Sequence, residues 1–203
     1  MRPIILASAS PRRAELLNQL GLRFSVCPVN IDETPGPGES AAHYVERLAR
    51  EKAAAGLALA ATPDSLVIGS DTSVVQGDTI LGKPANEEQA GLMLSGLSGR
   101  CHRVMTAVAL AGPHGCHARL VTTEVRFRSL AEEEIRAYCR TGEPMDKAGA
   151  YGIQGKGGVF VDRLWGSYSA VVGLPLEETA GLLADAGQPV WKYWNQPEEE
   201  HHE

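Results

Sequence analysis

Residues 3–21 read PIILASASPRRAELLNQLG, and this stretch decides the fold. Its first five residues form a short apolar run, which is typical of a buried strand. Ser10 and Pro11 then supply an N-cap and a first-turn proline, and Gly21 follows a leucine stripe as a C-terminal stop. The stretch therefore predicts a strand that leads directly into a helix.

Hydrophobic periodicity continues this alternation along the rest of the chain. The expected elements are, in order, a strand at 22–28, a helix at 41–59, a strand beginning at 65–69, a helix begun by Asn86, a hairpin of 103–111 and 119–127 around the turn 112–115, a helix at 131–140, a glycine-dense stretch at 149–158 without regular structure, a hairpin around Trp165 and Gly166, and a helix opened by Pro175. Such alternation predicts an α/β protein with a mixed, elongated sheet and flanking helices. We expect one domain over residues 1–195 and an acidic, disordered tail over 196–203.

Composition narrows the class of protein. Of 203 residues, 43% are hydrophobic and 22% are charged, which is typical of a folded chain and not of a disordered one. No apolar stretch approaches the roughly 18 residues that suggest a membrane span. The N-terminal apolar run leads into a helix start and not into a cleavage site, so we expect a cytoplasmic protein with no membrane partner. The net charge of −6 argues against a nucleic acid partner.

The turn SASPRR, residues 8–13, is the strongest local signal for a binding site. It joins a strand to the N-terminus of a helix, where backbone N–H groups are free and the partial charge is positive. Adding Arg12 and Arg13 there is locally unfavourable unless an anion binds. The turn is therefore a candidate phosphate cradle. In the alternative, Ser10 only caps the helix and the arginines are solvated or pair with Glu15.

Two acidic positions are candidates for chemistry. Asp71 lies within the apolar run VIGSDTSVV, residues 67–75, where a buried carboxylate is costly without a cation or hydrogen-bond donors. It is therefore a candidate metal ligand or general base, or else a structural aspartate bonded to backbone amides. Glu33 lies in the segment NIDE before a Pro/Gly loop. Placed beside Asp71, it would complete the pair of carboxylates that Mg²⁺ binds when a nucleotide supplies the other oxygens.

Three further positions are candidate ligand contacts. Lys52 lies on the inward-facing stripe of the predicted helix at 41–59, and Lys83 lies between Gly82 and Pro84 in a turn-like segment. Lys52 can equally extend along the helix surface to solvent. The segment DKAGAYGIQGKGG, residues 146–158, allows close backbone approach to a ligand, with Gln154 offering a donor and an acceptor to a base edge. The alternative for that segment is an ordinary mobile loop.

Taken together, these segments resemble the Maf family of nucleotide pyrophosphatases. The resemblance runs from Leu6 to about Thr179 and rests on motifs in a fixed order. They are SASPRR, NIDE, GSDT, LGKP, LSGRCHRVMTAVAL, DKAGAYGIQGKGGVFV and GSYSAVVGLPLEET. The resemblance implies two α/β lobes around a central cleft, a fold related to inosine triphosphate pyrophosphatases, and a homodimer.

The resemblance also implies roles for individual residues. Asp71 matches the proton acceptor of the family, and Glu33 matches an acid that helps to hold a divalent metal cation, Mg²⁺ or Mn²⁺. The positions that match the phosphate site are Ser8, Arg13, Lys52 and Lys83. The implied reaction is hydrolysis of a nucleoside triphosphate to the monophosphate and pyrophosphate.

Within the family, this sequence is similar to the branch that acts on dTTP and UTP. That branch carries arginine, threonine and glutamine where this chain has Arg12, Thr72 and Gln154, whereas the branch that acts on 7-methyl-GTP carries tryptophan at the first of these places. Two alternatives stay open at this point. One is a nucleotide-binding regulator of cell division without significant turnover, and the other is an enzyme whose true substrates are modified pyrimidine nucleotides.

Overall fold

The computed structural model describes residues 2–194, and a seven-stranded mixed sheet forms its centre. The strand order is β2-β1-β3-β5-β6-β7, and β4 pairs with β3 off this path. The strands are β1 (Ile4–Leu6), β2 (Ser25–Val26), β3 (Leu66–Gln76), β4 (Thr79–Leu81), β5 (Cys101–Gly112), β6 (Gly115–Phe127) and β7 (Val161–Trp165). Because β1 runs parallel to both of its neighbours and the other pairs are antiparallel, the prediction of a mixed sheet is confirmed.

Helices connect and cover these strands. They are α1 (Pro11–Gln19), α2 (Ala41–Ala58), α3 (Glu87–Leu97), α4 (Glu132–Cys139), α5 (Tyr168–Val172) and α6 (Leu176–Asp185), with the 3-10 helices η1 (Glu143–Asp146), η2 (Ala148–Ala150), η3 (Lys156–Phe160) and η4 (Val190–Tyr193). Side-chain caps begin three of them: Ser40 accepts from His43 N at 3.3 Å, Asn86 accepts from Gln89 N at 2.8 Å, and Ser167 accepts from Ala170 N at 3.2 Å. Within residues 2–194, none of these helices is both long and apolar enough to span a bilayer.

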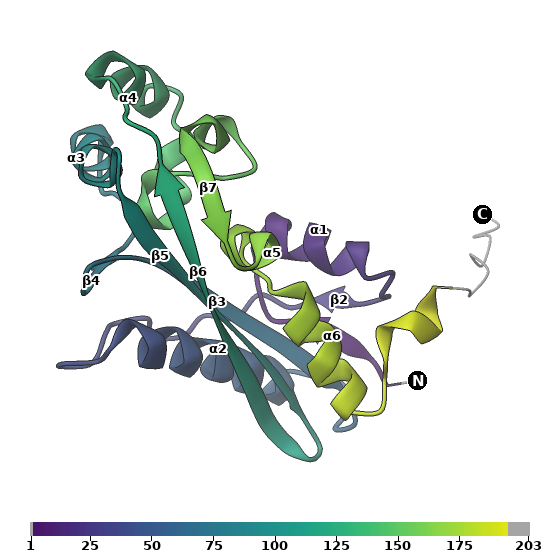
Figure 1. Ribbon diagram of the computed structural model, residues 1–203. Coiled ribbons are helices and arrows are strands. Elements are labelled where there is room, and N and C mark those ends of the chain that lie inside the picture. The colour runs from purple at the N-terminus through teal and green to yellow at the C-terminus, as the bar shows by residue number, and fades with distance from the viewer. Residues whose placement is uncertain (1, 195–203) are drawn as a thin grey trace.

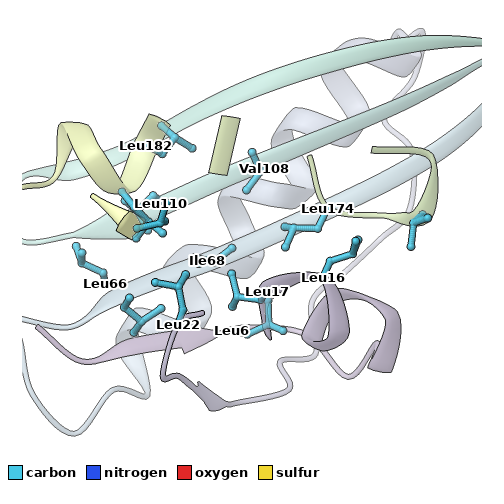
Figure 2. Close-up of a cluster of buried hydrophobic side chains, with 14 residues drawn as sticks. Leu6, Leu16, Leu17, Leu22, Leu66, Ile68, Val108, Leu110, Leu174 and Leu182 are labelled. Carbon is cyan, nitrogen blue, oxygen red and sulfur yellow. The ribbon is translucent and has the colours of Figure 1, made fainter. Parts of the chain in front are cut away.

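The helices cover both faces of the long strands (Figure 1). On one face, Val45, Ala49 and Ala53 of α2 pack against small and branched residues of β3 and β5. On the other face, α1, α5 and α6 cover a leucine-rich cluster (Figure 2). There, Leu17 of α1 and Leu182 of α6 belong to the same cluster as Ile68 of β3. Burial of this apolar surface is the main force that holds the helices on the sheet.

A second apolar cluster lies at the other end of the sheet. It is built from α3, α4 and the 3-10 helices around the aromatic residues Phe127, Tyr138 and Phe160. The long strands β3, β5 and β6 run through both ends, so they join two lobes into one sheet (Figure 1). The expected two-lobed α/β fold is therefore confirmed.

Close approach of α2 to β3 depends on one glycine. A Cβ atom built at Gly69 would lie 2.5 Å from the backbone nitrogen of Ala53 and would also collide with the carbonyl oxygen of Ala49. These are backbone atoms of α2, which cannot move aside as a flexible side chain can. Gly69 therefore sets the distance between the helix and the strand.

Most predicted elements are confirmed, and three expectations need correction. The strand expected at 22–28 is reduced to β2, two residues long. The hairpin expected around Trp165 and Gly166 is wrong: β7 ends at Trp165, Gly166 turns the chain with a φ of +129°, and α5 begins at Tyr168. The stretch 149–158 contains 3-10 turns and is not wholly irregular. The predicted tail, 196–203, lies outside the described residues.

We expect Gly69→Ala to destabilise the protein by about 3 kcal/mol, because the added methyl group overpacks a rigid helix–strand contact. Urea unfolding at equilibrium measures this change. Gly181→Ala is the matched control, since a Cβ at this helical position meets nothing within 4 Å. It should leave stability unchanged or raise it by about 0.5–1 kcal/mol. Equal stability of the two variants would contradict the packing role of Gly69.

The buried histidine His102 predicts a loss of stability in mild acid. Burial lowers its pKa from 6.5 to about 4, and its Nε2 lies 2.9 Å from the hydroxyl of Tyr151. As pH falls, this histidine is protonated in the unfolded chain before it is protonated in the folded protein. Its contribution to the free energy of unfolding is therefore fully present above the unfolded pKa and is lost as pH falls from that value to the folded pKa. This one residue should lower the free energy of unfolding by about 2 kcal/mol between pH 7 and pH 5.

Urea unfolding of His102→Gln at both pH values tests this origin, because glutamine does not titrate. The variant should lose less stability between pH 7 and pH 5 than the wild type does. His114→Gln, in the exposed turn between β5 and β6, should keep the wild-type dependence. An identical pH dependence in His102→Gln and wild type would show that other groups cause the loss of stability in acid.

Candidate active site

A gap in strand pairing opens the site at one edge of β3. On this edge β1 pairs with β3 as far as Ile68, and β4 pairs with it from Val74 onward. Between them, residues 69–73 have no partner strand on this side within residues 2–194. A cleft of about 640 Å³ lies here, lined by residues of both lobes. The other edge of the same residues pairs with β5 without a break, which holds the floor of the cleft.

Side chains from both faces of β3 reach this cleft, because successive residues of a strand point to opposite faces. Asp71 faces α2, where its Oδ1 accepts a hydrogen bond from Lys52 Nζ at 2.7 Å. Thr72 faces the other side, where its Oγ1 lies 3.0 Å from the Oγ1 of Thr106. Both Asp71 and Thr72 line the cleft. One strand therefore presents a carboxylate on one face and a hydroxyl on the other.

Two carboxylates converge on a single ammonium group. Lys52 Nζ lies 2.7 Å from Asp71 Oδ1 and also 2.7 Å from Glu33 Oε1. Lys52 and Asp71 are only 9% and 8% exposed, so each charge is buried against its partner. Two turns before Lys52 on α2, Tyr44 donates to the carbonyl oxygen of Glu33 at 2.8 Å and fixes the loop that carries the second acid. The structure thus joins three segments into an acid–lysine–acid cluster.

The two acids differ in basicity. Burial raises the pKa of Asp71, and the positive charges of Lys52 and Arg13 offset this only in part. Burial also acts on Glu33, but the hydrogen bond and charge of Lys52, with the charges of Lys83 and Arg13, bring its pKa below the ordinary value. Asp71 is therefore the better proton acceptor, while Glu33 is held as a carboxylate.

The arginine turn is anchored on the protein and faces the same cleft. Arg13 donates through Nε to the carbonyl oxygen of Gly173 at 2.9 Å and through Nη1 to Ser8 Oγ at 3.3 Å. Ser8 is 7% exposed, lies behind Arg13, and accepts from Ser10 N at 3.2 Å. Ser8 is not among the residues that line the described cleft, so it supports the arginine. Ser10 is the N-cap residue of α1 but makes no side-chain cap.

Arg12 lies nearer the mouth of the cleft. Its Nη1 is 3.4 Å from Asp146 Oδ2, across the cleft on η1. The arginines therefore pair with Asp146 and with the carbonyl of Gly173, and these contacts argue against the alternative in which both pair with Glu15. Burial lowers the pKa of Arg13, and the group still stays cationic because a guanidinium titrates far above neutral pH.

The cleft also has an apolar wall and further polar groups in its lining. Its wall is formed by Val74, Val104, Tyr151, Ile153 and Val171. Gln154 and Lys83 are exposed residues that line the same cleft, Gln154 from the glycine-rich loop and Lys83 from the segment after β4. An apolar wall with a few polar groups suits a flat ring, whereas the cations of the cleft suit phosphates. Apart from Ser8, every predicted site residue lines this cleft.

Comparison with known proteins gives the family. Residues 3–186 match the family described as Maf-like protein. This chain belongs to the Maf-like family. A dTTP/UTP pyrophosphatase of Hahella chejuensis is 52% identical to it over 191 residues, which cover 94% of this chain and 95% of the relative. Another of Colwellia psychrerythraea is 57% identical over 187 residues, covering 91% and 88%. The resemblance seen in the motifs is confirmed.

Among solved structures, a nucleoside-triphosphatase (dITP/XTP pyrophosphatase) of Mycobacterium abscessus aligns with 96% of this chain and all of its own. The identity is 17% and the TM-score is 0.44. A Staphylococcus aureus Ham1 protein gives the same TM-score over 62% of this chain and 72% of its own, at 16% identity.

The Maf-like site contains two residues that sequence reasoning missed, Tyr44 and Glu143, and it also contains Asp146 and Lys147, which begin the segment 146–158 singled out from the sequence. A signal existed for Tyr44, which lies two helical turns before Lys52 on the same stripe of α2. The signal for Asp146 and Lys147 was the glycine-dense segment that they begin, whereas nothing in the local sequence distinguishes Glu143 from a solvated loop residue. All three belong to η1 or follow it directly. Their place in the site comes from the folding of distant segments around η1.

The glycine-rich loop of this Maf-like chain closes around one of these residues. Glu143 Oε1 accepts from Gly157 N at 3.1 Å, and Oε2 accepts from Lys156 N at 3.0 Å. A Cβ atom at Gly155 would collide with the Glu143 carboxylate. The expectation that these glycines allow close approach to a bound ligand therefore needs a correction. At Gly155 the group that approaches closely is a side chain of the protein itself.

Two acids of the cleft, Asp71 and Glu33, are candidate ligands for a divalent metal ion. Within residues 2–194 no group of three or more His, Cys, Asp or Glu side chains is arranged to hold a metal ion. Asp71 and Glu33 nevertheless point one oxygen each at the same ammonium group, so the site already places a cation between two acids. Mg²⁺ commonly takes one or two carboxylates and completes its shell with water and substrate phosphates. The residues present fit that pattern.

Proposed function

We propose that this Maf-like protein is a nucleoside triphosphate pyrophosphatase that hydrolyses dTTP and UTP to the monophosphate and pyrophosphate. The observation that carries the proposal is the acid–lysine–acid cluster in a cleft that also holds the arginine turn. Its support from relatives is that proteins 52% and 57% identical over most of the chain are named dTTP/UTP pyrophosphatases.

Asp71 is the residue best suited to accept the proton of the attacking water. It faces the cleft, and burial raises its pKa above that of an ordinary aspartate, which makes its carboxylate a stronger base. The hydrogen bond from Lys52 to Oδ1 orients the carboxylate. Water held by the other face of this carboxylate would attack the α-phosphorus, and the bond to the β-phosphate would break.

Cations of the cleft would stabilise the pyrophosphate that leaves. Arg13, Lys52 and Lys83 come from three different segments and line one cavity. Charge that develops on the leaving group would be met by groups that are already oriented, and such preorganised charge is usually the largest contribution in phosphate chemistry. Arg13 is oriented by its hydrogen bonds to Gly173 and Ser8, and Lys52 by its contacts with Asp71 and Glu33.

We also propose that Glu33 and Asp71 hold a divalent cation, Mg²⁺ or Mn²⁺. When bound, such a cation supplies positive charge that gathers phosphate oxygens. Glu33 is suited to this role because its pKa lies below the ordinary value, so it stays ionised. Lys52 would then share the two acids with the metal.

Arg12, Thr72 and Gln154 are proposed to contact the base or sugar of the nucleotide. Thr72 lies on the face of β3 away from Asp71, and Gln154 projects from the glycine-rich loop. The amide of Gln154 can donate and accept at once, as uracil and thymine require along one edge. The expected homodimer and the cytoplasmic location stay predictions.

Asp71→Asn tests the role of the proton acceptor. Amide and carboxylate have nearly the same shape, so the variant should fold, but it should lose at least about 10²-fold in turnover, the usual contribution of a positioned base. Release of pyrophosphate from UTP in the presence of Mn²⁺ measures the effect, and urea unfolding checks the fold. Asp185→Asn, on α6 and paired with Arg119, is the matched control and should keep wild-type turnover. If the wild-type protein released no pyrophosphate, the result would contradict the proposed enzyme and favour the alternative, a nucleotide-binding regulator.

Gln154→Ala tests base recognition. Removing the amide should lower the preference for UTP and dTTP over CTP by about tenfold, because a lost hydrogen bond to a buried base edge costs about 1–1.5 kcal/mol. The measurement is kcat/KM for the three nucleotides. Gln19→Ala, on the exposed end of α1, should change none of them. An equal loss on all three nucleotides would contradict a base-reading role.

A further inference from the structure

Glu143 holds the glycine-rich loop through both of its carboxylate oxygens. Oε1 accepts from the Tyr138 hydroxyl at 2.9 Å and from Gly157 N at 3.1 Å, and Oε2 accepts from Lys156 N at 3.0 Å. Two consecutive backbone N–H groups that converge in this way form a small anion-binding concavity. In this chain the anion is an internal carboxylate, so these N–H groups are not free to hold a phosphate.

The carboxylate itself is fixed in place. Gly142 has a φ of +75° and turns the chain into η1, where Glu143 N donates to Thr141 Oγ1 at 3.2 Å. Lys147 Nζ donates to the carbonyl oxygen of Glu143 at 2.8 Å. Burial raises the pKa of Glu143, but hydrogen bonds from Gly157, Lys156 and Tyr138 bring it below the ordinary value. Glu143 is therefore a carboxylate on a rigid support.

Gln154 lies between the two parts of the loop that are bound by Tyr138 and Glu143. Gly155 N donates to Gly152 O at 3.1 Å and closes a four-residue turn in which Gln154 is the third residue. At the first residue of the turn, Gly152 N donates to the Tyr138 hydroxyl at 3.2 Å. After it, the next two N–H groups donate to Glu143. The same carboxylate thus anchors the turn directly on one side and through a tyrosine on the other.

We propose that Glu143 is the positioning residue for Gln154, and that it sets the preference for uracil and thymine over cytosine without taking part in the chemistry. This inference rests on the proposed function. Its physical reason is that uracil offers N3–H and cytosine offers a bare N3, so discrimination requires the amide of Gln154 to hold one position and orientation. Asp71, the proposed proton acceptor, is bound by Lys52 of α2 and not by Glu143.

The test is Glu143→Gln, which has almost the same shape but replaces one accepting oxygen by an NH₂ group. That group would face a backbone N–H, so one anchor of the loop is lost. The ratio of kcat/KM for UTP to that for CTP should fall about tenfold, mainly through KM for UTP, while kcat for UTP stays within about threefold. Glu133→Gln, an exposed acid of α4, controls for the change of charge and should keep the wild-type ratio.

Tyr138→Phe is a second variant, which keeps the inference testable if Glu143→Gln does not fold. It removes the hydroxyl that links Glu143 to Gly152 and should lower the same ratio by a smaller factor. A lower thermal midpoint with an unchanged UTP/CTP ratio would reduce Glu143 to a structural residue and overturn the inference. Equal loss of kcat on both nucleotides would place Glu143 in the chemistry and overturn it as well.

The two proposals fail in different ways. Absence of pyrophosphate release by the wild type overturns the proposed function. A wild type that prefers UTP, with a preference that survives in both variants, overturns only the role of Glu143. Calorimetric affinities for UMP and CMP add a readout that does not depend on turnover. The ratio of these two affinities should fall in Glu143→Gln and not in Glu133→Gln.

Discussion

The contact of Lys52 with Asp71 and Glu33 is the interaction on which the arrangement of the site depends. A lysine and an aspartate that are each less than a tenth exposed are costly to bury alone, and each offsets part of that cost for the other. The contact also requires α2 to lie close against β3. Gly69, two residues before Asp71, allows that approach because it has no side chain to collide with Ala49 and Ala53. Charge pairing and backbone packing therefore support one another at the same point of the sheet.

Local signals were sufficient for most of the secondary structure. The apolar run at 3–7, the stripe of the helix at 41–59 and the cap at Asn86 each depend on residues close together in the chain, and each is confirmed. The failures have a common cause. Residues 22–28 look apolar enough for a strand, yet only two of them find a partner, along β1. Gly166 suggests a hairpin, but Ser167 caps a helix immediately after it and the strand pairs backward with β6.

The same distinction explains what could be predicted of the site. Asp71, Lys52 and the arginine turn were recognisable because each places a charge where its own neighbours disfavour one. That they meet, however, depends on the parallel pairing of β1 with β3, which no local pattern fixes. Glu143 carried no such signal. The glycines at 152–158 indicated that something approaches the backbone closely, but their sequence did not reveal that it is a glutamate about a dozen residues earlier.

The gap in pairing along β3 has a consequence for how such a protein can diversify. Because residues 69–73 alternate between two faces, Asp71 and Thr72 are neighbours in the chain but belong to separate environments, one against α2 and the other against β5 and α5. A substitution on the second face would change the surroundings of Thr72 and leave the contact of Asp71 with Lys52 intact. Under the proposed function, selectivity and cleavage would thus be carried by adjacent codons yet could evolve as independent traits.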